Sequence, residues 1–566
     1  MWVVLILVAF LVLQVQGKDI TLDFNVSWID GVNLDGQFSR RAIGINGQWP
    51  PAPVSVMSND ILKVNYRNTF GDGTVSTLHA HGLLYNGTNY FDGAAGVAQC
   101  PVPDGQMYPY EILNSPHGST ATKKETGTYW MHGHYKGQYV DGLRFPFIIH
   151  NSEGEPHQYD DDYTVILADW YRHEHHYLVK HVYLKPNGTY PTPSSGLMYF
   201  AHTKAGKEAK YLDGFNENAT LPFEPGKKYR LRVINMSAAS MFNVWLEGHK
   251  MSIIEVDGVD VEPYPIDTLQ ITIGQRYSIL VEARNETSHN WKMHANMDPS
   301  MFPPRSSLSL NLTSTISYGN RTAKMGSDRP TVDSYELLFD ETRLKPVDVV
   351  PMVEADMSVN MIAGMPMYED GIVRGTFNNK TFVPPLTPSI LSMTTLPPSY
   401  ATNAASYGPY SNAVVASHMQ MVEMVILNFS KDKHPFHLHG TKFQVVNKVS
   451  DLRTMDRKKN PPLRENQKNP VRRDTVAVPS GGSVTIRFRA DNPGAWIMHC
   501  HMDWHLSAGM AMLMIQAPDQ ASSLHVPKVL KDQCKMQGFP ISGNAGGIPN
   551  STIAFGSLSV PPPLAH

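Results

Sequence analysis

Short hydrophobic runs recur along the whole chain, and clusters of Gly, Pro, Asn and Asp separate them. In runs such as ILKVNYRN (61–68) and SVTIRFR (483–489), apolar and polar residues alternate and β-branched residues are frequent. Because successive side chains of a strand point to opposite faces, this pattern predicts β-strands. Only HMDWHLSAGMAM (501–512) is expected to form a short helical turn. The pattern therefore predicts an all-β fold.

A loose internal repeat divides the chain into three units. One strand pattern occurs near the start of each unit, as ILKVNYRN (61–68), KKYRLRVIN (227–235) and EMVILNF (423–429). A late strand follows each of them, as FPFIIH (145–150), YSILVEA (277–283) and AMLMIQAP (511–518). The polar segments 151–162 and 319–334 are predicted linkers. We therefore expect three related β-sandwich domains. Their predicted bounds are 18–155, 156–335 and 336–566, after a leader at 1–17.

The composition agrees with this architecture and excludes one kind of partner. At 566 residues the chain has room for about three or four domains. Its 42 glycines and 42 prolines suit a turn-rich sandwich better than a helical protein. The formal net charge of -3 gives no sign of a polyanionic partner, so we expect no nucleic-acid binding. We expect the protein to be a monomer.

The first 17 residues, MWVVLILVAFLVLQVQG, form an apolar run of signal-peptide length that is short for a membrane span. The tail that ends at His566 contains neither a span nor a lipid-anchor signal. Eleven N-x-S/T sequons agree with export, since glycosylation needs a lumenal route and a surface position. They begin at Asn25, Asn86, Asn187, Asn218, Asn235, Asn285, Asn311, Asn320, Asn379, Asn428 and Asn550. We expect a secreted, extracellular or cell-surface glycoprotein without a C-terminal transmembrane anchor.

Only three cysteines occur, Cys100, Cys500 and Cys534. In an exported protein an odd number indicates one disulfide and one thiol with a separate role. Cys500 stands between two histidines, which marks it as the thiol with the separate role. We therefore expect a disulfide between Cys100 and Cys534, which would join the N-terminal part of the chain to its C-terminal tail.

The histidines point to metal binding, because ten of the 24 fall into four compact motifs. On a strand, residues two apart face the same side, so an H-x-H pair can bind one metal or two adjacent metals. The motifs contain His79 and His81; His132 and His134; His434, His437 and His439; and His499, His501 and His505. Ten imidazoles and a thiolate far exceed the ligands of one zinc site, and zinc has no redox chemistry.

The run His499-Cys500-His501 is more specific than the H-x-H pairs. On an extended strand Cys500 faces one way and its two neighbours face the other, so the peptide would connect two metal sites within a few bonds. A thiolate, two imidazoles and a weak Met sulfur define a blue-copper site. The candidate ligands are His434, Cys500 and His505, with Met510 in the axial position.

The motifs LHAHG, GTYWMHGH, HPFHLHG and HCHMDWHLSAGM together resemble those of the multicopper oxidases, over almost the whole mature chain. The resemblance implies three cupredoxin-like Greek-key β-sandwich domains and four copper ions, one of type 1, one of type 2 and two of type 3. Type 1 would have the ligands named above. By motif position, the resemblance assigns His79 and His437 to the type 2 copper. One type 3 copper would take His81, His132 and His501, and the other would take His134, His439 and His499. The cluster of three coppers is expected between the first and third domains, because both supply ligands.

Within this family the sequence most resembles the fungal iron-uptake ferroxidases, in phrases such as LADWYRHE, FNNKTF, VRRDTV and PISGNAGG. This implies one-electron oxidation of Fe(II) near the type 1 histidines, coupled to four-electron reduction of O2 to water. Asp169 lies where such proteins carry an acid, and its carboxylate is expected to bind Fe(II). Asp298 and Asp432 are weaker candidates for the same role. Asp92, in YFDGAAG, is the candidate proton relay.

Three alternative functions stay open. They are a laccase that oxidises phenols and aryl amines, with Asp169 orienting the phenol; an ascorbate oxidase; and a copper-storage protein, which the 28 methionines support slightly. Membrane-anchored ferroxidases carry a C-terminal span that this sequence lacks, which argues against a tight pairing with an iron permease. His173, His175 and His176, in YRHEHHY, are interpreted as a solvated strand end or loop rather than an extra metal site.

Overall fold

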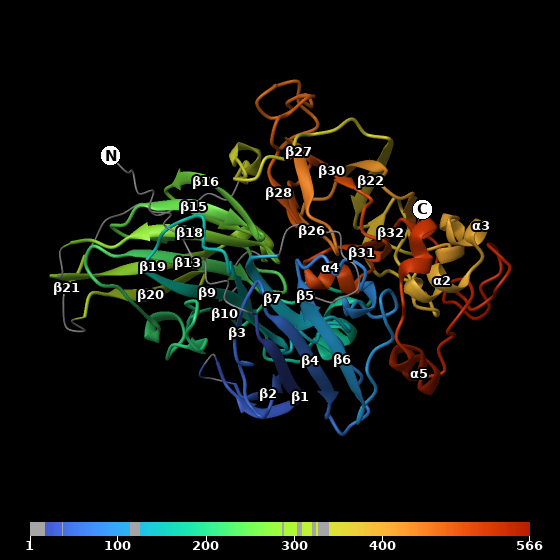
Figure 1. Cartoon of the computed structure of the whole chain (residues 1–566), viewed down its shortest axis with the longest axis horizontal. Helices are drawn as coiled ribbons and strands as arrows, with labels where there is room; N and C mark the ends of the chain where they lie inside the picture. Colours follow the sequence, from blue (N-terminus) through green and yellow to red (C-terminus); the bar gives the residue numbers. More distant parts are fainter. Residues whose placement is uncertain are drawn as a thin grey trace, which may run out of the picture.

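The computed structural model describes residues 17–565 except 35, 37, 114–124, 286–287, 303–307, 320–323 and 327–338. The expected leader and most of the second predicted linker therefore lie outside the described residues. Six β-sheets form three successive pairs along the chain (Figure 1). The predicted all-β fold is confirmed.

The first pair of sheets comes from the N-terminal part of the chain, drawn in blue in Figure 1. Its strand orders are β2-β1-β4-β6 and β3-β8-β7-β5. In β4 the alternating residues Leu62, Val64 and Tyr66 are fully buried, so the alternation in the sequence marks the core-facing side. The strands are β1 (Asp19–Val32), β2 (Arg40–Ile45), β3 (Val54–Met57), β4 (Ile61–Asn68), β5 (Leu78–His81), β6 (Met107–Leu113), β7 (Gly127–Gly133) and β8 (Arg144–His150).

The middle pair, drawn in green, has a seven-stranded sheet, β11-β10-β9-β13-β18-β15-β16, and a six-stranded sheet that contains β12-β20-β19-β14-β17 with β21 beside β19. The strands are β9 (Asp161–Trp170), β10 (Ser195–His202), β11 (Lys210–Tyr211), β12 (Thr220–Pro222), β13 (Lys228–Asn235), β14 (Phe242–Leu246), β15 (Met251–Val256), β16 (Val259–Ile266), β17 (Leu269–Ile271), β18 (Arg276–Glu282), β19 (His289–Met297), β20 (Asn311–Ser317) and β21 (Lys324–Met325). Helix α1 (His175–Leu178) and the single π-turn η2 (Val179–Tyr183) lie between β9 and β10.

The third pair, in yellow to red, has the strand orders β23-β22-β25-β30-β27-β28 and β24-β32-β31-β26-β29. The strands are β22 (Met357–Gly364), β23 (Thr376–Phe377), β24 (Val414–Ala416), β25 (Met421–Asn428), β26 (His434–Leu438), β27 (Phe443–Val449), β28 (Arg472–Arg473), β29 (Thr475–Val478), β30 (Ser483–Arg489), β31 (Gly494–Cys500) and β32 (Ala511–Gln516). Four short helices accompany them: α2 (Ser389–Thr395), α3 (Pro398–Ala401), α4 (Asp503–Ser507) and α5 (Lys528–Met536).

The internal repeat is visible in the strand pairing. The repeated strand is β4, β13 and β25, and each runs parallel to the first strand of its own unit, β1, β9 or β22. The late strands β8 and β32 also have a parallel neighbour, β3 and β24. In the middle unit β20 takes that place beside β12, whereas YSILVEA forms most of β18 in the opposite sheet. The assignment of YSILVEA as the equivalent late strand is therefore wrong, because the polar sequence of β20 (NLTSTIS) hides its equivalence.

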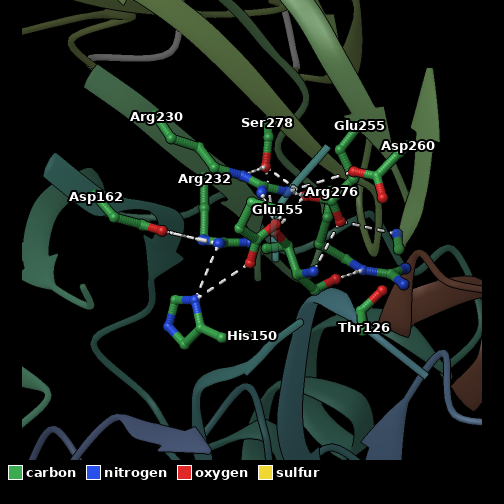
Figure 2. A network of polar contacts seen from close by, with 12 residues as sticks. Thr126, His150, Glu155, Asp162, Arg230, Arg232, Glu255, Asp260, Arg276 and Ser278 are labelled. Carbon is green, nitrogen blue, oxygen red and sulfur yellow. Dashed lines mark hydrogen bonds and ion pairs between the residues drawn. The ribbon is translucent and has the colours of Figure 1, made fainter. Parts of the chain in front are cut away.

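A buried network of charges connects the middle sandwich to the other two, and Figure 2 shows its part around Arg230, Arg232 and Glu255. Arg230 donates to Glu255 at 2.7 Å, and Thr128 of β7 donates to the same carboxylate through both its backbone N and its hydroxyl at 2.7 Å. Arg276 donates two hydrogen bonds of 2.7 Å to Asp474, which lies in the third sandwich. Buried charges persist when they are paired in this way, and the pairing fixes Asp474 in position.

A disulfide joins Cys100 to Cys534, which are 434 positions apart in the sequence, and α5 carries the second cysteine. No helix in the described part of the chain is both long and apolar enough to span a membrane. Each predicted domain, 18–155, 156–335 and 336–566, contains one pair of sheets, and the bounds themselves stay predictions.

Candidate metal centre

Four strands bring the histidine motifs together between the first and third sandwiches (Figure 1). In the ladder of β5 and β7, His79 is opposite His132, and in that of β26 and β31, His437 is opposite His499. The two ladders meet, since the rings of His81 and His437 stack with centroids 3.7 Å apart. The resulting cluster contains His79, His81, His132, His134, His437, His439, His499 and His501.

Several of these imidazoles bind the protein with one nitrogen and leave the other inside the cluster. Nδ1 of His79 donates to the carbonyl oxygen of Asp92 at 2.6 Å, and Nδ1 of His132 donates to a backbone carbonyl at 3.0 Å. Their Nε2 atoms, and those of His134 and His437, are buried without a hydrogen-bond partner among the described residues. A buried nitrogen without a partner is costly unless a metal binds it, so this donor set fits transition-metal ions.

The ring nitrogens also form compact groups. Those of His134, His439 and His499, one predicted type 3 set, lie within 4.8 Å of one another, and the Nε2 atoms of His439 and His499 are 3.2 Å apart. In the other predicted set, Nδ1 of His81 is 3.1 Å from Nε2 of His501. The division of the cluster among individual ions stays a prediction, because the same nitrogens form other groups of three as well.

The Cys500 thiol faces a separate site, formed with His434 and His505. Its Sγ is 3.5 Å from Nδ1 of His434 and 3.4 Å from Nδ1 of His505, and the two nitrogens are 3.0 Å apart. The point equidistant from the three atoms is about 2 Å from each, which is the length of a metal–nitrogen bond. Met510 is buried. Its backbone carbonyl accepts a hydrogen bond from the N–H of Cys500 at 3.1 Å, and its backbone N–H donates to the carbonyl of His505 at 2.9 Å. Its role as axial ligand stays a prediction.

Burial sets the protonation state of these ligands. It lowers the pKa of His434 and of His134 to about 3, so both imidazoles are neutral near pH 7 and keep a free lone pair. It raises the pKa of the Cys500 thiol, so the thiolate forms where a cation replaces the proton. Ionisation of the thiol and binding of the metal are therefore linked.

Two buried carboxylates accept hydrogen bonds from ring nitrogens of cluster histidines. Asp92 accepts a hydrogen bond from Nδ1 of His439 at 2.9 Å. Asp474 accepts one from Nε2 of His81 at 3.1 Å, and Arg276 donates to both of its oxygens. Burial alone would raise the pKa of Asp474, but Arg276 outweighs burial and holds it well below its usual range. The phrase VRRDTV contains Asp474, yet no spacing in the sequence marks it as a partner of histidines.

A cavity of about 1240 Å³ connects the cluster to the surface. Its lining contains the exposed residues Lys136 and His176 as well as the buried ligands His132 and His501. A cavity that reaches from exposed loops to these histidines gives small molecules a route from solvent to the cluster.

His175 also lines this cavity, and the interpretation of this residue as solvated is wrong. It is 5% exposed, its ring stacks on that of Trp504, and its Nε2 is 2.6 Å from a carboxylate oxygen of Asp503. The neighbouring residues His173 and His176 are exposed. The local sequence gives no signal for this difference, because the partners of His175 come from α4 of the third sandwich.

Asp169, the predicted iron-binding acid, has a different role. It is fully buried, and its carboxylate accepts hydrogen bonds from the backbone N–H groups of Ala238, Ala239 and Ser240 at 2.8, 2.9 and 3.1 Å. The hydroxyl of Ser240 adds a fourth bond at 3.0 Å. Because the carboxylate is fully buried and both of its oxygens accept hydrogen bonds from this loop, Asp169 holds the loop after β13 and is not accessible to iron or to a phenol. The prediction is therefore wrong.

Asp298 and Asp432, the two other candidates for an iron-binding acid, differ in exposure and in their partners. Asp298 is 2% exposed and pairs with Nζ of Lys433 at 2.6 Å, so a cation of the protein already neutralises it. The side chain of Asp432 is 32% exposed, and its Oδ2 is 3.8 Å from Nε2 of His505. Among the three acids considered from the sequence, Asp432 is the one that lies beside the Cys500 site with part of its carboxylate at the surface.

A thiol with two imidazoles on one side of a strand and a histidine cluster on the other side are donor sets that suit transition-metal ions. The multicopper oxidase family profile matches residues 26–154, 161–320 and 382–520. The chain belongs to the multicopper oxidase family, which confirms the predicted family and its three cupredoxin-like domains. The metal of this family is copper, which fits the donors of the Cys500 site and of the histidine cluster.

The relatives include iron oxidases. The iron multicopper oxidase fer1 of Mycosarcoma maydis is 46% identical over 562 residues, which cover 98% of this chain and 89% of the relative. The iron transport multicopper oxidase fio1 of Schizosaccharomyces pombe is 36% identical over 563 residues, which cover 97% and 84%. Among solved structures, that of Fet3p, described as a multicopper oxidase that functions in iron import, has a TM-score of 0.82 at 29% identity and covers 96% of this chain and 98% of its own. The laccase of Botrytis aclada has a TM-score of 0.75 at 27% identity and covers 92% of each chain.

Proposed function

We propose that this protein is a ferroxidase that couples the oxidation of four Fe(II) ions to the reduction of one O2 to two waters, with four coppers as cofactors: one type 1, one type 2 and two type 3. The observation that carries this proposal is the carboxylate of Asp432, which is about one-third exposed and lies 3.8 Å from Nε2 of His505. A carboxylate oxygen is a suitable ligand for a hard cation and favours Fe(III) over Fe(II). The relatives that are named iron multicopper oxidases support the same substrate.

The residues of this chain have separate tasks in the reaction. Bound copper supplies the one-electron redox chemistry at the Cys500 site and the reduction of O2 at the cluster. Asp432 binds Fe(II) beside His505, and the backbone of Cys500 connects its thiolate to His499 and His501 within a few covalent bonds. Asp92 holds His439 in orientation and remains the proposed proton relay to the cluster.

A laccase is the alternative with a specific observation behind it, which is the structural similarity to the Botrytis aclada laccase. A phenolic substrate binds well where an imidazole N–H at the type 1 site is free to hydrogen-bond its oxygen. Here Nε2 of His434 donates to Ser430 Oγ at 2.7 Å, and Nε2 of His505 is 3.0 Å from the hydroxyl of Tyr190. Both N–H groups are therefore occupied, which favours Fe(II) at Asp432 over a phenol at the imidazoles.

Steady-state oxygen consumption with Fe(II), hydroquinone, p-phenylenediamine and ascorbate as separate substrates tests the proposal. We expect kcat/KM to be highest for Fe(II), and Asp432→Asn to lower it about tenfold or more for Fe(II) while changing the value for hydroquinone less than about twofold. The control Asp213→Asn, at an exposed position in the middle sandwich, should change neither. Equal losses for both substrates in Asp432→Asn, or a preference of the wild type for hydroquinone or ascorbate, would overturn the proposal. Absence of oxygen consumption with every reductant would favour copper storage.

We also propose that the protein acts as a monomer outside the cell or at its surface, with O2 and Fe(II) as its small-molecule partners and no iron permease bound tightly. The disulfide between Cys100 and Cys534 supports this location, because disulfides persist in oxidising compartments. Sequons at exposed positions, such as Asn187 and Asn379, support it as well.

A further inference from the structure

Tyr190 occupies the outer edge of the Cys500 site. It lies in the loop between η2 and β10 of the middle sandwich, although the ligands of the site come from the third. Its hydroxyl is 3.0 Å from Nε2 of His505 and 3.3 Å from Oδ2 of Asp432. Because Nδ1 of His505 faces the Cys500 sulfur, Nε2 carries the hydrogen and donates to Tyr190, which in turn donates to Asp432.

Packing holds the Tyr190 ring in this place. The ring lies 5.2 Å from that of Tyr183 at an interplanar angle of 29°, and its centroid is 5.4 Å from the imidazole of His505 in an edge-on arrangement. A phenol side chain thus presents its oxygen to the N–H of His505 in the way that a phenolic substrate would have to do. No such substrate can reach this N–H while Tyr190 remains there.

We propose that Tyr190 determines the specificity of this site, in a way that deepens the proposed ferroxidase function and rests on it. Its hydroxyl connects the iron-binding carboxylate of Asp432 to His505 by two hydrogen bonds, and its ring occupies the position that an aromatic substrate needs. The first property couples Fe(II) to the metal site, and the second excludes phenols and aryl amines. The substrate class selected is a small divalent metal ion.

The redox balance requires no further reactant. Each Fe(II) bound at Asp432 loses one electron and becomes Fe(III), and no atom moves between Fe and Tyr190. The electron leaves along the hydrogen bonds from Asp432 through Tyr190 to His505. Four such electrons, one O2 and four protons give two waters, so the established family reaction supplies the oxidant.

The variant Tyr190→Phe removes the hydroxyl and keeps the ring. We expect kcat for Fe(II) to fall about tenfold or more with KM within about twofold of wild type, because Asp432 still binds iron. Loss of an acceptor makes the His505 imidazole less electron-donating, so the potential of the type 1 site, measured by redox titration of the absorbance near 600 nm, should rise. A higher potential alone would speed the oxidation of Fe(II), so a slower rate with a higher potential identifies the lost connection.

The variant Tyr190→Ala removes the ring as well. We expect kcat/KM for hydroquinone and p-phenylenediamine to rise about tenfold or more over wild type, because the His505 N–H becomes accessible to their oxygen or nitrogen. In Tyr190→Phe the ring still blocks this place, so activity on both compounds should stay within about twofold of wild type. A gain of activity also shows that the variant is folded and loaded with copper.

Tyr177→Phe is the control, because it removes the hydroxyl of an exposed tyrosine on α1 and leaves Tyr190 and its packing partner Tyr183 intact. It should leave the potential and all rates unchanged. The proposal is overturned if Tyr190→Phe keeps the wild-type rate with Fe(II), if its potential does not rise, or if Tyr190→Ala gains no activity on aromatic reductants. Should Asp432→Asn also leave the oxidation of Fe(II) intact, the ferroxidase proposal fails with it; should Asp432→Asn abolish it, only the role of Tyr190 fails.

Discussion

At the scale of single residues, the metal centre depends on buried carboxylates that hydrogen-bond its histidines. Asp474 is the clearest case, because its Oδ1 accepts a hydrogen bond from His81 while Arg276 donates to both of its oxygens. An acceptor on the far nitrogen fixes the orientation of a ligand ring and raises its basicity. Asp474 therefore connects the charge network of the middle sandwich to the copper cluster.

Asp474→Asn tests this connection. The change removes the negative charge beside Arg276 and weakens the bond to His81, so we expect copper affinity at the cluster to fall about 10- to 100-fold and the free energy of unfolding to fall by about 3 kcal/mol. Copper analysis and absorbance near 600 nm should show that the Cys500 site stays occupied while total copper falls. Full copper content in the variant would contradict the role of Asp474, and Asp213→Asn serves as the exposed control.

His175 gives a prediction about pH. Burial alone would lower its pKa, but Asp503 and Asp141 outweigh burial and raise the pKa above its ordinary value. A raised pKa in the folded state means that His175 stabilises the protein fully below pH about 6.5, and that this contribution is lost as pH rises through the folded-state pKa.

We therefore expect His175→Gln to be less stable than wild type by about 3 kcal/mol at pH 6, with the difference shrinking as pH rises. Thermal unfolding of both copper-loaded proteins between pH 5.5 and 9 measures this. His176→Gln, which changes an exposed neighbour, should follow the wild-type curve. A difference that is constant across this range, or that grows with pH, would contradict the raised pKa.

At the scale of elements, the turn after α4 sets the Cys500 site. His505 lies on α4, and Met510 follows it through Gly509, whose φ is +97°. The backbone N–H of Met510 donates to the carbonyl of His505 at 2.9 Å, which closes the turn. A side chain at Gly509 would place its Cβ 2.4 Å from Cγ2 of Thr381. The turn thus requires glycine for both backbone conformation and space.

Gly509→Ala should accordingly destabilise the protein and disturb the copper site. The left-handed backbone costs about 1 to 2 kcal/mol, and the contact with Thr381 adds to it. Gly538→Ala is a matched control, because Gly538 has a φ of +76° but no atom within 4 Å of the added Cβ. We expect Gly509→Ala to lower both the melting temperature and the absorbance near 600 nm more than Gly538→Ala does. Equal effects in the two variants would show that backbone strain alone causes the loss of stability and that the turn does not determine the geometry of the Cys500 site.

The sequence could predict the features that depend on the spacing of residues within one motif. H-x-H pairs face one side of a strand, and in the structure His79 and His81 of β5 meet His437 and His439 in the cluster, while Cys500 faces His434 and His505. The features that it could not predict depend on partners far along the chain. Asp169 is saturated by the loop after β13, and His175 is buried by α4. A single sequence records neither contact, so a buried structural acid and a substrate acid look the same in it.

At the scale of the whole molecule, the three sandwiches contribute unequally to the metal centre. The first and third supply the ligands, and the cluster therefore exists only where these two meet. The middle sandwich supplies no predicted copper ligand, but it provides Arg276 behind the cluster and Tyr190 at the Cys500 site. The residues that bind copper and the residue that we propose to select the substrate therefore lie in different sandwiches.

The folded surface also decides which sequons can carry glycans. Asn235 and Asn428 are fully buried, and the Nδ2 group of each donates two hydrogen bonds to backbone carbonyls. A glycan would replace one of the two hydrogens on Nδ2 and has no room in the core, so a chain modified there could not reach this fold. Asn187 and Asn379, in contrast, are exposed. Asn235 and Asn428, two of the eleven sequons, therefore lack the surface position that glycosylation needs.

We predict that the active protein secreted from a glycosylating host carries glycans at exposed sequons such as Asn187 and Asn379, and none at Asn235 or Asn428. Mass spectrometry of peptides after enzymatic deglycosylation in H2(18)O measures occupancy at each site. Asn428→Gln should lower the free energy of unfolding by about 2 kcal/mol because two buried acceptors lose their donor, whereas Asn187→Gln should remove one glycan with little effect on stability. A glycan found on Asn235 or Asn428 in copper-loaded, active protein would contradict the burial of these side chains, and with it the packing of β13 and β25 against their neighbours.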